Sequence, residues 1–369
     1  MNSFKLVLTV FIFMLVVFSP ACWPHGAKPA VLDLDISETD MSGNWWISAL
    51  DLHMAIDLDA NKDSVITYYE FKQKRKDMLL YMQNNLFLFS GDSGCQLNVA
   101  EPQLSRTETS VFIQMPFQSN CHTNLSLRYT VLAEIDFNHR LIANISSGGK
   151  VQTLIMKPDE SSVKLIVDEQ SRWISVAQFI QQGVIHILEG YDHLLFLLAL
   201  LVPIVASKLK KRSGVNGLRE LTFPLLKITG AFTVGHSATL ILASVFNYSP
   251  PMTWVEVIIA CSVFIAGLNI VFGFFRESSW KIAGTFGLIH GFGFASVLAE
   301  IELARANYLV SLLSFNLGVE IGQLMVIVLA MPLLLVLVAK PKLASVTRYS
   351  SASFAAIFGL IWMVERLPL

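Results

Sequence analysis

Residues 183–201 read GVIHILEGYDHLLFLLALL, an apolar run that opens with two histidines and two carboxylates. Such a run can enter a lipid bilayer, where ionisable groups are costly and usually face a cavity, an ion pathway or one another. Imidazole and carboxylate are also side chains that hold a transition metal. The stretch therefore predicts a membrane protein that handles an ion.

The spacing of these polar residues limits how they can share an ion. On a helix, His186, Glu189 and His193 lie on one face, because steps of three, four and seven residues return to the same side. A straight helix separates His186 from His193 by about 10 Å along its axis, so they share an ion only if Gly190 interrupts the helix. Asp192 points about 100° away from His193 on a helix and is expected to orient a group of another helix.

The composition of the chain is that of an integral membrane protein. Of 369 residues, 53% are hydrophobic and 15% charged, and the mean hydropathy is +0.55. The formal net charge is −1 and no basic tract contains interleaved aromatic residues, so no nucleic-acid partner is predicted. Acidic residues crowd the first half, whereas the second half is apolar with basic loops. We therefore expect an extramembrane domain followed by a membrane domain.

The first residues are typical of an export signal. Lys5 precedes an apolar run over residues 6–18, and small residues follow that run. The pattern predicts a secretory signal peptide at residues 1–21, with an uncleaved membrane anchor as the alternative. The region that follows is then extracytoplasmic.

That exported region, residues 26–172, is expected to form a β-rich domain, with a sandwich as the simplest arrangement. Short alternating or apolar segments between turn residues are typical of strands. Such segments cover residues 30–36, 111–115, 126–135, 151–156 and 163–167. Cys95 and Cys121 lie in the same region, and a disulfide is their natural pairing in an oxidising compartment.

Residues 59–70 match the calcium-binding loop of an EF-hand, in which oxygen ligands fall at positions 1, 3, 5, 7, 9 and 12. The residues at these positions are Asp59, Asn61, Asp63, Val65, Thr67 and Glu70, with Val65 contributing its backbone carbonyl. Ser64 replaces the usual glycine, which makes the sharp turn costlier and favours weak, structural calcium binding. A helix is expected over Trp45–Leu58 before the loop and another after it. The alternative is a loop of this shape that binds no calcium.

From Trp173 onward, hydropathy predicts six membrane spans, so residues 173–369 are expected to form an α-helical bundle. The predicted spans are 176–206, 223–246, 253–275, 280–301, 307–338 and 345–364. Basic residues concentrate in the first, third and fifth connections, which the positive-inside rule places in the cytoplasm. Both ends of the bundle then lie outside the cytoplasm, in agreement with an exported N-terminal domain.

Polar side chains from several spans complete the predicted site. A single membrane histidine is usually a packing residue, and serine, threonine, asparagine and glutamine can simply join helices. Histidines and carboxylates that come from several spans are instead what a bundle needs to build an ion site or a proton relay. The predicted metal ligands are His186, Glu189, Asp192, His193, His236, His290 and Glu320, and a polar stripe beside Glu320 adds Asn316 and Gln323.

Several of these motifs together resemble the HupE/UreJ family of bacterial membrane proteins. The motifs are His186-x5-Asp192-His193 with Gly190, Gly235-His236-Ser237, His290-Gly-Phe-Gly-Phe, and Asn316-x-Gly318-x-Glu320-x-Gly322-Gln323. The resemblance covers about residues 173–364 and points to the longer branch of the family, which has an exported N-terminal domain. Members are linked to hydrogenase and urease maturation and are regarded as nickel or cobalt permeases or accessory proteins. The resemblance implies metal handling by His186, Asp192 and His193, in a bacterial inner membrane with the N-terminal domain in the periplasm.

The first functional hypothesis is a permease for a divalent transition metal, with nickel or cobalt favoured and zinc as a further candidate. His186 and Glu189 would receive the ion, and the other ligands would form an inner site. The alternatives are a membrane-embedded metal-dependent hydrolase, with Glu189 or Glu320 as general base, and an accessory protein whose exported domain binds a protein partner. Neither His-Glu-x-x-His nor Gly-x-Ser-x-Gly occurs, so an enzyme is the less favoured of these. The expected partners are therefore the metal ion, membrane lipid and a protein that meets the exported domain.

Overall fold

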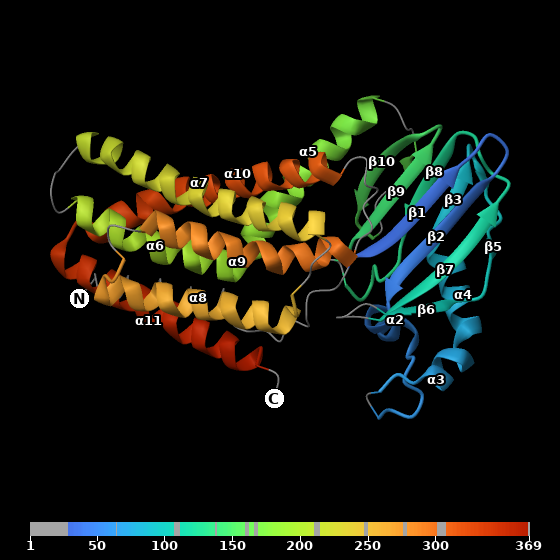
Figure 1. Ribbon diagram of the computed structural model, residues 1–369, viewed down its shortest axis with the longest axis horizontal. Helices are drawn as coiled ribbons and strands as arrows, with labels where there is room; N and C mark the ends of the chain where they lie inside the picture. The colour runs from blue at the N-terminus through green and yellow to red at the C-terminus, as the bar shows by residue number, and fades with distance from the viewer. Residues whose placement is uncertain are drawn as a thin grey trace. The chain divides into compact units, whose positions relative to one another are not determined.

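The computed structural model describes residues 29–367 except 64, 107–110, 137–138, 159–161, 166–168, 210–214, 247–249, 276–278 and 301–307. The described chain divides into two compact units, whose elements are labelled in Figure 1. The described chain up to Gln178 belongs to the β-rich unit, and the helical unit takes in Phe179–Ala299 and Leu309–Leu369. The expected signal peptide at residues 1–21 lies outside the described residues.

Two sheets build the β-rich unit. The first has the order β10-β9-β1-β2-β7-β5, with β6 also paired to β7, and the second has the order β11-β8-β3-β4. Only β1 and β9 pair in parallel among the described strands. The bounds are β1 Ala30–Ile36, β2 Met41–Ser48, β3 Leu86–Ser90, β4 Ser93–Gly94, β5 Asn98–Val99, β6 Gln103–Arg106, β7 Val111–Ser119, β8 Leu125–Tyr129, β9 Leu141–Ser147, β10 Lys150–Met156 and β11 Val163–Lys164.

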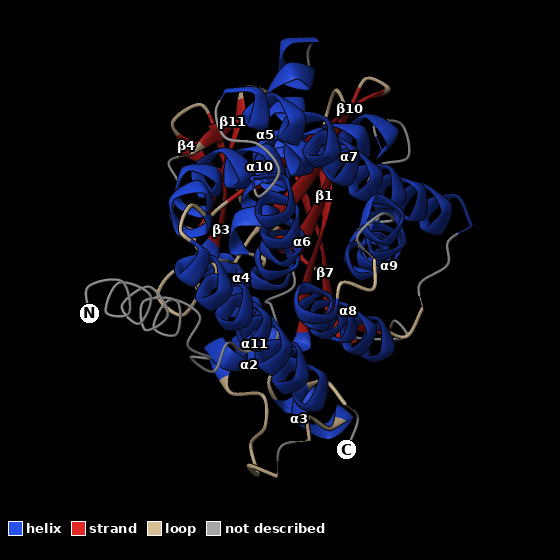
Figure 2. Ribbon diagram, turned by 90° about the vertical axis from the view of Figure 1, so that its left-hand side faces the viewer, coloured by secondary structure: helices blue, strands red, loops and turns tan. Residues whose placement is uncertain are grey.

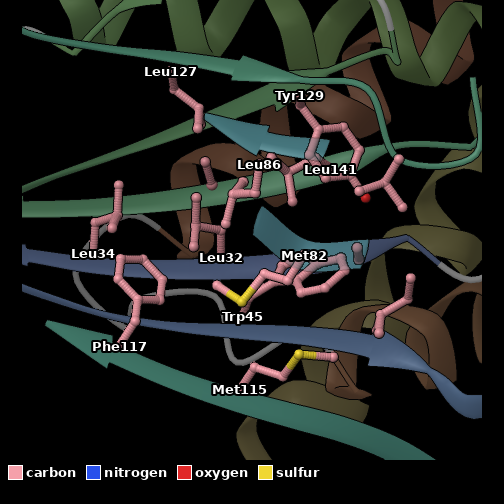
Figure 3. Packing of buried hydrophobic residues seen from close by; sticks show 14 of the residues in the cluster. Leu32, Leu34, Trp45, Met82, Leu86, Met115, Phe117, Leu127, Tyr129 and Leu141 are labelled. Carbon is pink, nitrogen blue, oxygen red and sulfur yellow. The ribbon is translucent and has the colours of Figure 1, made fainter. Parts of the chain in front are cut away.

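One hydrophobic core joins the two sheets. Leu32 and Trp45 of the first sheet and Leu127 and Tyr129 of the second are fully buried and belong to the same cluster. Figure 3 shows these side chains facing one another, with Met82 of helix α4 (Arg75–Asn85) among them. Side chains of a strand alternate between its two faces, so each sheet contributes every second residue to this core. The predicted β-rich domain is confirmed, and its sheets pack as a sandwich.

The helix predicted over Trp45–Leu58 is wrong in its first part. Strand β2 continues to Ser48 because it is paired on both edges, with β1 and with β7. The Ser48 side chain then accepts a hydrogen bond from the Leu50 N–H and caps α2, which covers Ala49–Ile56. Sheet pairing thus overrides the local preference for a helix.

The strand predicted over residues 126–135 is too long. Strand β8 ends at Tyr129, and residues 131–135 form a turn in which Leu132 has a positive φ of 59°. By contrast, the predicted disulfide between Cys95 and Cys121 is present, with 5.9 Å between the Cα atoms. It ties the segment before β5 to the segment after β7.

The outer edge of the first sheet is covered by the start of helix α5, which covers Glu169–Glu189. The Gln178 side chain accepts a hydrogen bond from the Ile155 N–H at 3.1 Å and donates one to the Ile155 carbonyl at 3.2 Å. The Ser175 hydroxyl donates to the Thr153 carbonyl at 2.6 Å. The side chains of α5 thus take the place of a further strand beside β10.

The helical unit contains the candidate membrane helices of the described chain. Their bounds, after α5, are α6 Tyr191–Leu209, α7 Val215–Phe246, α8 Met252–Phe272, α9 Ser279–Glu300, α10 Tyr308–Val338 and α11 Pro341–Glu365. Three helices, α7, α8 and α10, contain a stretch long and apolar enough to cross a membrane, and the bent pair α5 and α6 makes a fourth if it counts as one span. The described residues therefore support three or four spans, and the predicted six are not confirmed.

Glycines allow the helices of this unit to approach closely. A Cβ on Gly318 of α10 would lie 2.0 Å from the Ile180 carbonyl oxygen of α5, and one on Gly287 of α9 would lie 2.2 Å from the Phe232 carbonyl oxygen of α7. Small residues at crossings are a usual way for membrane helices to pack. Helices α8 and α11 also lie side by side in Figures 1 and 2. The crossings of α5 with α10 and of α7 with α9 position the candidate site.

Candidate metal site

A break between α5 and α6 brings His186 and His193 together. The two helices meet at Gly190 with a bend of 71°. The Gly190 N–H still donates to the His186 carbonyl, and the Gly190 carbonyl accepts from the Leu194 N–H. A Cβ at Gly190 would lie 2.6 Å from His193 Nδ1, so glycine is required here. The two imidazole centroids lie 4.7 Å apart, instead of the separation that a straight helix would impose.

Two further histidines come from α7 and α9 and complete the histidine cluster, which consists of His186, His193, His236 and His290. The ring centroid of His290 lies 4.8 Å from that of His193, and His236 lies 6.4 Å from His186. Phe232 packs against His193, His236 and His290 with centroid distances of 6.1, 6.1 and 5.3 Å. Four imidazoles from four helices therefore meet beside an aromatic ring.

Three of these imidazoles use Nδ1 for a hydrogen bond to an oxygen. His193 Nδ1 lies 2.9 Å from Asp192 Oδ1, His236 Nδ1 lies 3.0 Å from Asn316 Oδ1, and His290 Nδ1 lies 2.8 Å from the Phe286 carbonyl. The Asn316 amide nitrogen donates to the Leu312 carbonyl, which leaves its oxygen for His236. A carboxylate, an amide oxygen and a carbonyl can only accept, so each Nδ1 carries the proton.

The other ring nitrogen of the same three histidines has no partner. Nε2 of His193, His236 and His290 is buried and makes no hydrogen bond within the described chain. Leaving a buried polar atom unsatisfied costs about 1–3 kcal/mol. Histidines that bind metals show this same pattern, with one ring N–H held by an oxygen and the other nitrogen on the metal. The three Nε2 lone pairs are therefore suited to a cation.

The structure does not bring all the predicted ligands together. Glu189 is exposed at the end of α5, and Glu320 is half-buried on α10. Across the described residues, neither carboxylate has a hydrogen bond to the histidine cluster. In the same part of the chain, no three His, Cys, Asp or Glu side chains already stand in a geometry that holds a metal ion. Coordination therefore requires the imidazole rings to turn toward a common point.

The sequence predicted that Asp192 would orient a group of another helix, but its hydrogen bonds go to its own neighbour, His193, and it lies near Arg366 at the end of α11. Its Oδ1 accepts from both the backbone N–H and Nδ1 of His193, because the break at Gly190 places Asp192 in the first turn of α6. Its Oδ2 lies 3.9 Å from Nη2 of Arg366, whose Nη1 donates to the Glu256 carbonyl at 3.3 Å. Asp192 therefore links the histidine cluster to the end of α11.

Two contributors to the site were not predicted. The Phe286 carbonyl carries no signal in the sequence, because any residue could supply it. Arg366 did offer a signal, since a basic residue after the last predicted span departs from the positive-inside rule. The Phe286 carbonyl lies four residues before His290 on α9, and the Arg366 contact becomes visible only when α11 is placed.

The predicted calcium loop is held by its own polar side chains. The Asp63 N–H donates to Asn61 Oδ1 at 2.9 Å and to Asp59 Oδ1 at 3.3 Å, and the Val65 N–H donates to Asp63 Oδ1 at 2.9 Å. Ser64 lies outside the described residues. The oxygens at positions 1, 3 and 5 are thus drawn together by the backbone of the loop.

Glu70, at the last position of the loop, takes part in a capping box. Its Oε2 accepts from the Thr67 hydroxyl and N–H, and the Thr67 hydroxyl accepts from the Glu70 N–H at the start of α3 (Tyr68–Gln73). Its Oε1 accepts from the Ala60 N–H at 3.0 Å. The Thr67 hydroxyl, followed by the backbone N–H groups, holds the pKa of the Glu70 carboxyl below its usual range. The capping box accounts for this Thr-x-x-Glu pattern without a bound ion.

Comparison with known proteins places the helical unit in a family. The family described as HupE / UreJ protein matches residues 162–366, which is more than half of the chain and includes all four residues of the histidine cluster. A search of curated proteins finds no match. The family match agrees with the motifs around His186, His236, His290 and Asn316. The chain therefore belongs to the HupE/UreJ family.

Proposed function

We propose that this protein is a permease that moves a divalent transition metal, nickel or cobalt, across the bacterial inner membrane. One observation carries the proposal: three imidazoles have Nδ1 held by an oxygen and a buried Nε2 without a partner in the described chain. His186, on the bent helix pair, is the fourth ligand. The helical unit would cross the membrane six times, with the β-rich unit in the periplasm.

The donor set favours metals of intermediate softness. Neutral imidazole suits nickel, cobalt and zinc, whereas thiolate and thioether groups suit Cu(I). Cys261 of α8 is the one free cysteine in the described residues, and the cluster itself consists of histidines with the carboxylate of Asp192. The Asp192 charge offsets part of the charge of a divalent ion, and the imidazoles replace the water molecules that the ion loses.

A metal-dependent hydrolase finds less support. Such an enzyme needs a general base beside a metal-bound water. Glu189 and Glu320, the two carboxylates predicted for that role, have no hydrogen bond to the cluster among the described residues, and Phe232 packs on three of its four histidines. In an accessory role in metalloenzyme maturation, the same site would hold the metal for delivery to another protein instead of passing it across the membrane.

The β-rich unit would serve as a periplasmic docking surface for a protein partner. We propose that weak calcium binding at residues 59–70 stiffens it, through Asp59, Asn61, Asp63, the Val65 carbonyl, Thr67 and Glu70. For calcium to bind, Glu70 must turn at least one carboxyl oxygen away from Thr67 or Ala60 and toward the ion. Replacing Glu70 with glutamine would then abolish any protection of the unit by millimolar calcium against proteolysis.

The test of the permease is metal binding together with transport. We would purify the protein in detergent, load it with nickel or cobalt, and measure bound metal by mass spectrometry and uptake in proteoliposomes. His193→Ala should lose both, because His193 lies nearest to two other members of the cluster. The matched control is His122→Ala, which removes an exposed histidine of the β-rich unit. A wild type that takes up no transition metal, or a His193→Ala variant that behaves as wild type, would refute the proposal.

A further inference from the structure

We infer that Gln323 of α10 forms a second, inner station for the cation, next to the histidine cluster. The inference rests on the proposed permease function and extends it from a binding site to a route. Gln323, Thr229 and His193 contribute the polar lining of a small cavity, whose other walls are apolar.

The cavity is the size of a single water molecule or ion. Its volume is about 10 Å³, close to the minimum needed to hold one water. Phe232, which packs against the histidine cluster, also lines it. A dehydrated metal ion is no larger than a water molecule, so the space suits one ion.

The direction of the helices places this cavity on one defined side of the cluster. Gln323 follows Asn316 by seven residues on α10, and Thr229 precedes His236 by seven on α7, which is about 10 Å along each axis. Helix α10 runs toward its connection with α11, and α7 starts at its connection with α6. Both of these connections are rich in basic residues. The cavity therefore lies between the cluster and the end of the bundle that the positive-inside rule assigns to the cytoplasm.

Two polar atoms in or near the cavity lack a hydrogen-bond partner in the described chain, whereas the Thr229 hydroxyl, which also lines it, donates to the Leu225 and Leu226 carbonyls. Gln323 is 4% exposed, and its Oε1 has no hydrogen-bond partner among the described residues. Thr233 lies on α7 between Thr229 and His236; it is 8% exposed, and its Oγ1 is likewise unpaired in that part of the chain. Leucine at position 323 would avoid the cost of burying an unpaired amide. The lone pairs of Gln323 Oε1 and Thr233 Oγ1 are therefore best explained as transient ligands of an ion that moves through the bundle.

The chemistry of these groups suits release rather than capture. An amide or hydroxyl oxygen is a weaker ligand than imidazole for nickel or cobalt. Conduction needs sites that an ion can enter and also leave. A divalent ion can move from His193 Nε2 to Gln323 Oε1 and onward, because an uncharged oxygen does not trap it.

The experiment separates binding from passage. Wild type, Gln323→Leu and Gln323→Glu are purified, their Co²⁺ affinity is measured from the cobalt absorption spectrum, and Co²⁺ uptake is measured in proteoliposomes. Gln323→Leu should bind Co²⁺ with the affinity of wild type, but its rate of Co²⁺ uptake should fall about tenfold, because the route loses one neutral ligand. Gln323→Glu should bind Co²⁺ more tightly and also transport it more slowly. Gln181→Leu, which replaces an exposed glutamine of α5, is the matched control.

Each result decides the inference. Unchanged uptake in Gln323→Leu would show that the cavity holds only a buried water and would overturn it. Parallel loss of binding and uptake in that variant would also overturn it, because Gln323 would then belong to the first site. Thermal unfolding checks the fold, since Gln323→Leu should be at least as stable as wild type. A wild type that neither binds nor transports Co²⁺ would refute the permease itself, which is a different failure.

Discussion

Replacing Gly318 with alanine tests whether the crossing of α5 and α10 positions His186. The added methyl group would lie 2.0 Å from the Ile180 carbonyl oxygen, whereas ordinary contact begins at 3.4 Å. The two helices must therefore separate by about 1.4 Å, the difference between these distances. Metal–ligand distances hold to within about 0.2 Å. A shift of this size takes His186, six residues further along α5 than Ile180, out of reach of a shared ion.

The expected result is a loss of metal affinity of at least about tenfold, comparable to disturbing the support of a metal ligand. The assay is isothermal titration of the purified protein with Ni²⁺, accompanied by thermal unfolding, since overpacking also destabilises by about 1–3 kcal/mol. Gly230→Ala is the matched control, because a Cβ at Gly230 of α7 meets no atom within 4 Å. That variant should bind Ni²⁺ as wild type does.

A double-mutant cycle assigns the effect to His186. If Gly318→Ala acts by moving His186, it should cause little further loss in a His186→Ala background, because contacting sites are not additive. The same loss of affinity in both backgrounds would refute the reasoning. So would a Gly318→Ala protein that folds and binds Ni²⁺ like wild type.

Three further predictions concern the rest of the molecule. Burial lowers the pKa of His139 to about 4, so neutral His139 contributes fully to stability above pH 6.5, and this contribution is lost as the pH falls to 4. Hydrogen exchange of β9 should show that the free energy of unfolding falls by up to about 3 kcal/mol over this range, and that it does not fall in His139→Gln. Replacing both Cys95 and Cys121 with serine removes a disulfide whose cysteines are 26 residues apart. Urea unfolding should show that the free energy of unfolding falls by about 3–4 kcal/mol. Asp192→Asn keeps an oxygen for His193 but removes the charge, so titration with Ni²⁺ should show about tenfold weaker binding.

Periodicity and hydropathy were sufficient to predict helices and strands that keep the same face against a core along their length. The apolar runs predicted helices α7, α8 and α10, and alternation predicted strands such as β1, because one face of each meets a core. Trp45 was assigned to a helix because its burial depends on pairing with β1 and β7, which lie elsewhere in the sequence. Local preference cannot report such contacts.

The candidate site was predictable in its residue types but not in its partners. Gly190 between two histidines indicated that a break could unite them, and the bend of 71° does so. The amide of Asn316 that fixes His236 depends on how α7 and α10 cross, whereas the carbonyl of Phe286 that fixes His290 lies four residues before it on α9. Glu189 and Glu320 match the spacing of ligands, yet spacing alone does not show where a side chain lies once a helix ends or turns.

The side-chain cover on β10 has a practical consequence for the β-rich unit. An open sheet edge is a template for pairing with another chain, and Gln178 and Ser175 occupy that edge in place of a strand. A soluble fragment that stops before α5 would expose the Ile155 and Thr153 backbone and tend to aggregate edge to edge. A fragment extended through Gln178 would keep the edge closed and remain monomeric, so the first residues of α5 also protect the β-rich unit against self-association.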